Sequence, residues 1–160
     1  MTIDRRTLLA SGGAAVAGAL FFGRATDAAA ARYPVTKSAA EWRRQLGPAR
    51  YRILREAGTE RAYTSPLDKE KRRGTYRCAG CANPLFASTT KFESGTGWPS
   101  FYRALPKAVA TKTDRALGME RVEVLCARCG GHLGHVFRDG PRPTGLRYCM
   151  NGLALRFSPA

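Results

Sequence analysis

Five cysteines, four of them in two Cys-x-x-Cys pairs, limit the folds open to this chain of 160 residues. A domain-scale loop separates the two pairs. Each pair offers two thiolates from one tight turn, and two pairs supply the four ligands of a tetrahedral zinc ion. We therefore expect one zinc ion (Zn2+) bound by Cys78, Cys81, Cys126 and Cys129.

The same two pairs have two other interpretations, as two disulfides or as two redox-active dithiols. A catalytic zinc ion keeps one coordination position open for water or substrate, whereas cysteines fill all four positions here. If zinc is bound, its role is therefore structural.

The fifth cysteine, Cys149, remains as a free thiol. An inert buried cysteine is one interpretation, but the neighbours favour another. Arg147 precedes Cys149, and Asn151 follows it by two residues, so on a strand Asn151 and Cys149 share a face. A polar surface of this kind favours the thiolate. The two histidines of the chain, His132 and His135, directly follow the second cysteine pair. Cysteine with histidine and asparagine indicates an activated sulfur nucleophile.

The two histidines are three residues apart, so on a regular strand they face opposite sides of the sheet. Both can line one site only if Gly134, which lies between them, interrupts the alternation. A structural histidine remains the alternative interpretation for either residue.

The first 31 residues resemble an export signal more than part of a domain. Arg5 and Arg6 precede an apolar stretch at 10–22, which is short for crossing a bilayer, and small residues follow at 28–31. The paired arginines are typical of twin-arginine export. We expect cleavage after this segment and a periplasmic or exported protein, with an uncleaved membrane anchor as the alternative.

The rest of the chain divides into a linker at 32–37 and one domain at 38–160. Ser38 and Glu41 form a capping-box pattern, which predicts a helix from there to Gly47. A second short helix is predicted up to Gly58. We expect Trp42 to be a core residue without a chemical role.

The sequence after Pro66 favours strands. Gly, Pro and Thr become frequent, the apolar runs are short, and 121–126 alternates between apolar and polar residues. We predict one strand there and another over 147–157. The fold class is therefore mainly β, with antiparallel sheets and a short N-terminal helical cover.

The net charge of +15 is compatible with an anionic partner. No Lys/Arg run alternates with aromatic residues, as single-strand nucleic-acid grooves do, so we expect no nucleic-acid partner.

Six segments between about residues 38 and 157 carry long motifs. They are Gly74–Cys81, Gly95–Phe101 (Gly-Thr-Gly-Trp-Pro-Ser-Phe), Gly118–Val124, Cys126–Phe137 (Cys-Ala-Arg-Cys-Gly-Gly-His-Leu-Gly-His-Val-Phe), Asp139–Pro141 and Pro143–Cys149. Together these motifs resemble the methionine sulfoxide reductase B family. The resemblance implies reduction of the R epimer of methionine sulfoxide, mainly in proteins, by an antiparallel β protein with helices at its N-terminus.

The resemblance also implies roles for individual residues. Cys149 attacks the sulfoxide sulfur as a thiolate and becomes a sulfenic acid, while His135, helped by His132, supplies the proton that the leaving oxygen needs. Trp98 packs against the methyl group of the sulfoxide. Asn151 holds the site through hydrogen bonds.

Two further positions follow from the same resemblance. Asp139 is expected as a supporting polar residue behind the histidines. Thr96 stands where the family commonly has a second redox cysteine. The expected partners are therefore oxidised proteins carrying methionine-R-sulfoxide and an external thiol, either a thioredoxin-like protein or a small molecule. We expect a monomer.

Three rival functions remain at this point. They are a zinc ribbon that binds nucleic acid, a thiol hydrolase that needs no reductant, and an inactive family member that binds other proteins. The set Trp98, His135, Cys149 and Asn151 favours the reductase over the zinc ribbon, which has no need of it.

Overall fold

The computed structural model describes residues 33–160, and the proposed export signal at 1–31 lies outside them. Within the described residues, one α-helix, α1 (Ala39–Glu56), precedes nine strands and four short 3-10 helices. The strands are β1 (Gly74–Cys78), β2 (Pro84–Ala87), β3 (Lys91–Phe92), β4 (Ser100–Phe101), β5 (Val109–Asp114), β6 (Arg121–Cys126), β7 (His132–Phe137), β8 (Arg147–Met150) and β9 (Leu155–Pro159). The 3-10 helices are η2 (Pro66–Asp68), η3 (Ser88–Thr90), η4 (Ala116–Gly118) and η5 (Gly152–Ala154).

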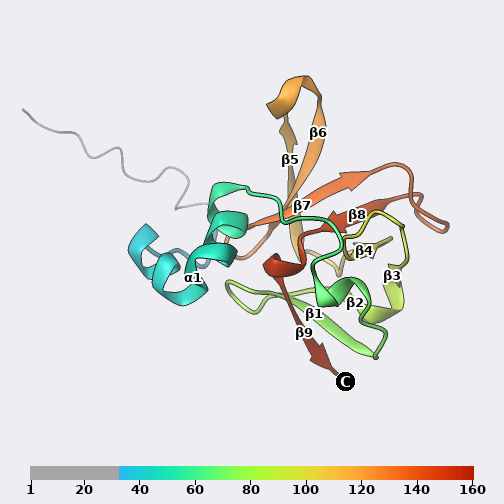
Figure 1. The fold of residues 1–160 in the computed structure, drawn as a ribbon, viewed down its shortest axis with the longest axis horizontal. Helices are drawn as coiled ribbons and strands as arrows, with labels where there is room; N and C mark the ends of the chain where they lie inside the picture. Colours follow the sequence, from blue (N-terminus) through green and yellow to red (C-terminus); the bar gives the residue numbers. More distant parts are fainter. Residues whose placement is uncertain (1–32) are drawn as a thin grey trace, which may run out of the picture.

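The strands form two antiparallel sheets. The small sheet has the order β2-β1-β9, and the large sheet has the order β3-β4-β8-β7-β6-β5. Figure 1 shows α1 beside the sheets and the β5–β6 hairpin projecting away from the rest of the molecule. The prediction of a mainly β, antiparallel protein with N-terminal helices is therefore confirmed.

The predicted break in the helical segment is present at Gly47. This residue has φ 67° and ψ 171°, so the two helical parts of α1 meet at a kink, and Pro48 begins the second part. Ser38 and Glu41 form the expected reciprocal capping box. Trp42 is 2% exposed and belongs to the core, as expected.

An aromatic cluster joins the two sheets. Phe101 of β4 stacks on Phe86 of β2 at 4.4 Å between ring centroids and meets the edge of Tyr76 of β1 at 4.8 Å. Phe86 also contacts Tyr148 of β8 at 5.7 Å. Three of these rings, Tyr76, Phe86 and Phe101, are fully buried, so their packing fixes β4 and β8 against the small sheet.

The predicted strand over 147–157 is wrong as a single element. The chain forms β8, then η5, and then β9, and the two strands belong to different sheets. The alternation over 121–126 is also only partly confirmed, because Val122 is 41% exposed while Glu123 is 5% exposed. The buried Glu123 has a partner, described below, that periodicity does not reveal.

No helix among residues 33–160 combines the length and the apolar character needed to cross a membrane.

Candidate active site and metal centre

The four cysteines of the two pairs converge on one point. Their sulfur atoms all lie within 4.8 Å of one another. The distance from Cys78 Sγ to Cys129 Sγ is 3.7 Å, and that from Cys81 Sγ to Cys126 Sγ is 3.5 Å. Four thiolates at about 2.3 Å from a tetrahedral zinc ion lie roughly 3.8 Å apart. The cluster therefore fits a metal ion, and the described cysteines form no disulfide.

Each cysteine pair lies in a turn of the same design. The N–H of Ala82 donates to the carbonyl of Cys78, and the N–H of Gly130 donates to that of Cys126. Both donors directly follow the second cysteine of their pair and have positive φ, 58° for Ala82 and 66° for Gly130. The left-handed residue turns the chain so that both thiols of a pair face the cluster.

Helix α1 contacts both turns. The amide of Gln45 donates to the carbonyl of Gly80, and the guanidinium of Arg55 donates to that of Cys129 at 2.9 Å. Arg55 also lies over the ring of Trp42, 5.0 Å from its centroid. The helix therefore braces the two cysteine turns from one side.

An irregularity in β7 brings the two histidines to the same side. The register with β6 shifts between Val124 and Leu125, so that Leu125 pairs with His132 and Glu123 pairs with His135. A Cβ atom on Gly134 would lie 2.1 Å from the carbonyl oxygen of Cys149, so only glycine fits. The interruption expected at Gly134 is present, and the two imidazole rings lie 5.5 Å apart.

A carboxylate from the β5–β6 hairpin contacts each histidine. Asp114 Oδ2 lies 2.8 Å from His135 Nε2, and Glu123 Oε1 lies 2.6 Å from His132 Nδ1. Lys112 pairs with the second oxygen of Glu123 at 2.9 Å. Asp139, which was expected behind the histidines, instead accepts two hydrogen bonds from Arg147. Asp114 and Glu123 therefore occupy the place expected for Asp139.

The two histidines have different surroundings. The side chain of His132 is 4% exposed, and burial lowers its pKa despite the hydrogen bond to Glu123. Its Nε2 atom has no hydrogen-bond partner among the described residues. The side chain of His135 is 12% exposed and borders a cavity, which His132 does not line.

This cavity has a volume of about 140 Å³ and brings most of the predicted site together. Cys149, His135, Asn151 and Trp98 all line it. The sequence analysis did not identify three further residues that contribute to it, which are Thr59, Arg121 and Phe137.

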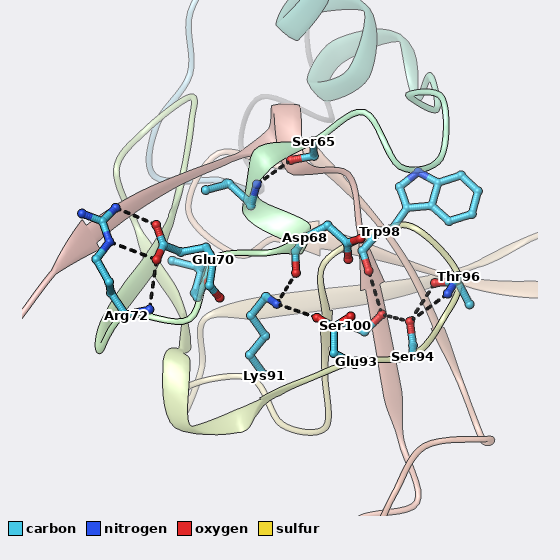
Figure 2. A network of polar contacts seen from close by, with 12 residues as sticks. Ser65, Asp68, Glu70, Arg72, Lys91, Glu93, Ser94, Thr96, Trp98 and Ser100 are labelled. Carbon is cyan, nitrogen blue, oxygen red and sulfur yellow. Dashed lines mark hydrogen bonds and ion pairs between the residues drawn. The ribbon is translucent and has the colours of Figure 1, made fainter.

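Thr96 lies directly beside the thiol. Its Oγ1 atom is 3.8 Å from Cys149 Sγ. A chain of hydroxyl contacts links Thr96 to Ser94 at 2.8 Å and Ser94 to Ser100 at 2.7 Å, and Ser100 donates to the carbonyl of Trp98. Figure 2 shows these contacts running from Thr96 through Ser94 and Ser100 to the backbone carbonyl of Trp98. The loop that carries Trp98 is thereby tied to β4, the neighbour of Cys149 in the sheet.

Burial has the largest effect on the pKa of the Cys149 thiol. It raises the pKa of Cys149, while Thr96, Arg147 and Ser100 act in the opposite direction. Arg147 is itself oriented by Asp139, whose carboxylate oxygens lie 2.9 Å and 2.8 Å from the guanidinium. The expectation that polar neighbours favour the thiolate is therefore correct in sign for Arg147, but burial outweighs it.

Glu60 organises the remaining side of the site, and the sequence analysis did not identify it. Its backbone N–H donates to Asn151 Oδ1 at 2.9 Å, and its carbonyl accepts from Trp98 Nε1 at 3.2 Å. Its buried carboxylate accepts from the N–H groups of Gly152 and Leu153. A lone glutamate in a loop carries no sequence signal for this role.

Replacing Arg147 should slow the reaction of Cys149 with iodoacetamide. Because the thiolate is the reactive form, and Arg147 lowers the pKa of Cys149, Arg147→Met should raise that pKa further. At pH 8 the alkylation rate should fall several-fold, and the difference should shrink at higher pH, where both thiols ionise. Cys149→Ser gives the background rate, and Arg138→Met removes an exposed charge as a control. Equal rates for Arg147→Met and wild type would contradict this electrostatic role.

Comparison with known proteins agrees with this architecture. The family model described as the SelR domain matches residues 46–159. The peptide methionine sulfoxide reductase MsrB of Leptospira interrogans is 57% identical over 126 residues, covering 78% of this chain and 96% of that protein. The proteins of the same name from Thiobacillus denitrificans (59% over 124 residues, covering 77% and 94%) and Agrobacterium fabrum (56% over 126 residues, covering 78% and 93%) are similarly close. The chain therefore belongs to the SelR-domain family of MsrB proteins.

Proposed function

We propose that this protein reduces methionine-R-sulfoxide in oxidised proteins and peptides to methionine. The proposal rests mainly on one observation. Cys149, His135 and Trp98 line the same small cavity. Membership of the MsrB family supports the same reaction. Sites for whole small-molecule ligands usually measure about 300–1,000 Å³, so a cavity of about 140 Å³ fits a side-chain end better.

The reaction balances with one thiolate and one proton. The Cys149 thiolate forms a bond to the sulfoxide sulfur as the oxygen takes up a proton. The oxygen then passes to the cysteine sulfur, so that the substrate sulfur–oxygen bond and the transient sulfur–sulfur bond break while a cysteine sulfur–oxygen bond forms. The products are the thioether of methionine and a sulfenic acid on Cys149. The substrate sulfur is thereby reduced and the cysteine sulfur oxidised. His135 is the proton donor, and His132 supports it from behind.

The surroundings of the cavity suit only one epimer of the sulfoxide, and the family resemblance implies that this is the R epimer. Trp98 offers an apolar face to the methyl group, while His135 offers a polar group to the oxygen. Asn151 is held on both sides, because it accepts from Glu60 and donates to the carbonyl of Leu133 at 3.2 Å. An asymmetric sulfur presents its methyl group and oxygen correctly in only one of its two configurations, so this arrangement discriminates between epimers.

Reduction of the sulfenic acid requires a thiol from outside the protein. Thr96 lies beside Cys149, where the family commonly has a second redox cysteine, and a hydroxyl group cannot form a disulfide. The other four cysteines converge on the candidate metal site, away from Cys149 in the proposed mechanism. A first external thiol forms a mixed disulfide with Cys149 and releases water, and a second one frees Cys149. Either a thioredoxin-like protein or a small thiol could act here.

A thiol hydrolase is a weaker candidate. In such enzymes a histidine contacts the sulfur nucleophile and activates it. Among residues 33–160, no hydrogen bond joins Cys149 Sγ to either histidine, and the thiol instead contacts the hydroxyl of Thr96. His135 is instead available to a group bound in the cavity, which suits protonation of an oxygen.

The proposal also includes zinc bound by the cysteine cluster and export of the protein through the twin-arginine route. That route carries folded proteins, so zinc bound before export would protect the four thiolates in an oxidising compartment. The mature protein is then periplasmic, with an uncleaved anchor as the alternative.

The reductase proposal is tested directly with separated R and S epimers of a dabsylated methionine sulfoxide and with dithiothreitol as reductant. The wild type should reduce the R epimer and leave the S epimer, because the cavity distinguishes the methyl group from the oxygen. Cys149→Ser should have no activity, since a hydroxyl is a far weaker nucleophile towards sulfur. Equal turnover by wild type and Cys149→Ser would refute the proposal.

Metal analysis of protein recovered from the periplasmic fraction should find one zinc ion per chain. Cys126→Ser should lose most of it and unfold at a lower temperature, because a structural site contributes to folding free energy. Cys149→Ser is the matched control and should keep the metal. Protein without zinc and with both cysteine pairs oxidised would contradict the zinc proposal, and absence of the protein from both the periplasmic and the membrane fractions would contradict export.

A further inference from the structure

The contacts of Asp114 set it apart from the other carboxylates near the site. Its Oδ1 accepts from the backbone N–H of Ala116 at 2.9 Å. Its Oδ2 lies 2.7 Å from Arg121 Nη2 and 2.8 Å from His135 Nε2. These contacts hold the pKa of Asp114 down at about 2, the backbone hydrogen bond having the largest effect. The group is therefore an anion at any pH near neutrality.

An anionic carboxylate can only accept hydrogen bonds, so the His135 nitrogen that faces it must carry hydrogen. The hydrogen of neutral His135 then resides on Nε2, and Nδ1 has a lone pair. Nδ1 makes no hydrogen bond within residues 33–160. It is also not fully buried, so it stays accessible to another group. Because Asp114 occupies Nε2 and His135 lines the cavity, Nδ1 is the nitrogen left for a group bound there.

We propose that Asp114 is the positioning residue of the reaction, which fixes the orientation and tautomer of His135 so that Nδ1 faces the sulfoxide oxygen. This inference rests on the proposed reductase function. In its protonated form His135 keeps Nε2–H on Asp114 and donates the hydrogen of Nδ1 to the oxygen. The neutral ring that remains is the tautomer that Asp114 selects, so proton transfer requires no ring rotation.

The second histidine shows that this arrangement is specific to His135. His132 is held by the opposite nitrogen, because its Nδ1 contacts Glu123. It is also more deeply buried and does not border the cavity of Cys149. The two carboxylates of the hairpin therefore orient two histidines in opposite ways, and only His135 presents a nitrogen to the substrate.

Arg121 completes the arrangement. It shares Oδ2 of Asp114 with His135 and itself lines the cavity. Residues Asp114 and Arg121 are direct partners in the β5–β6 ladder, so the hairpin fixes their separation. The projecting hairpin in Figure 1 thus has a role in the site as well as in the sheet.

The test compares Asp114→Asn with wild type and with Glu120→Gln. Glu120 is exposed on the same hairpin and pairs with Arg115, so its change removes an equal charge away from His135. Asp114→Asn should lower kcat for the R-sulfoxide about 100-fold, within the range for loss of general acid catalysis, and leave KM within a few-fold. Glu120→Gln should behave like wild type, and Asp114→Glu should recover part of the rate.

Nitrogen-15 NMR of the imidazole groups reads out the tautomer independently of activity. The chain has only two histidines, so the signals are assigned with one single variant. Neutral His135 in the wild type should show Nε2–H, and Asp114→Asn should change that pattern. Nδ1–H in wild-type His135, or unchanged kcat in a folded Asp114→Asn, would overturn the inference. A wild type without reductase activity would refute the proposed function, while the NMR result would still decide the role of Asp114 towards His135.

Discussion

Four cysteine sulfur atoms converge at one point between the two sheets. Cys78 lies at the end of β1 in the small sheet, and Cys126 lies at the end of β6 in the large sheet. The cluster therefore joins the two sheets at one point, and the aromatic cluster around Phe101 joins them at another. With two such connections the sheets cannot pivot against each other, and β7 and β8 are held as a stable support for the site.

The site itself arises from one local departure from regular strand geometry. Because β7 is irregular, His132 and His135 lie on the same side, and Gly134 lets the backbone of β8 approach closely. His135 and Cys149 are then direct partners across the ladder. The thiol and the imidazole are thereby placed by main-chain hydrogen bonds, which are more rigid than a loop would be.

Much of the fold and of the site could be predicted from the sequence, because those features depend on local pattern or on residue type. The cysteine spacing predicted the cluster, the capping box and Gly47 predicted the helical segment, and Gly134 predicted the break in alternation. Cys149 could be identified as the free thiol because the other four cysteines have the spacing of one metal site. Each of these residue types has few alternative structural roles in such a pattern, so its presence is informative.

The remaining features could not be predicted, because they depend on contacts between residues that are distant in the sequence. Asp114 and Glu123 resemble ordinary charged residues of an exposed hairpin, and only the fold places them against the histidines. Glu60 lies 91 residues before its partner Asn151, in a loop without a motif. The sequence also does not reveal that the pKa of Cys149 is raised, because the burial that raises it depends on the whole fold and not on residues adjacent in sequence.

In the proposed mechanism Cys149 alone carries the redox chemistry of this chain. Intact and peptide mass spectrometry after a single turnover with methionine-R-sulfoxide, in the absence of reductant, tests this directly. We expect one added oxygen on Cys149, trapped as a sulfenic acid by dimedone, with the other four cysteines unchanged. An internal disulfide between Cys149 and any cysteine of the metal cluster would contradict it.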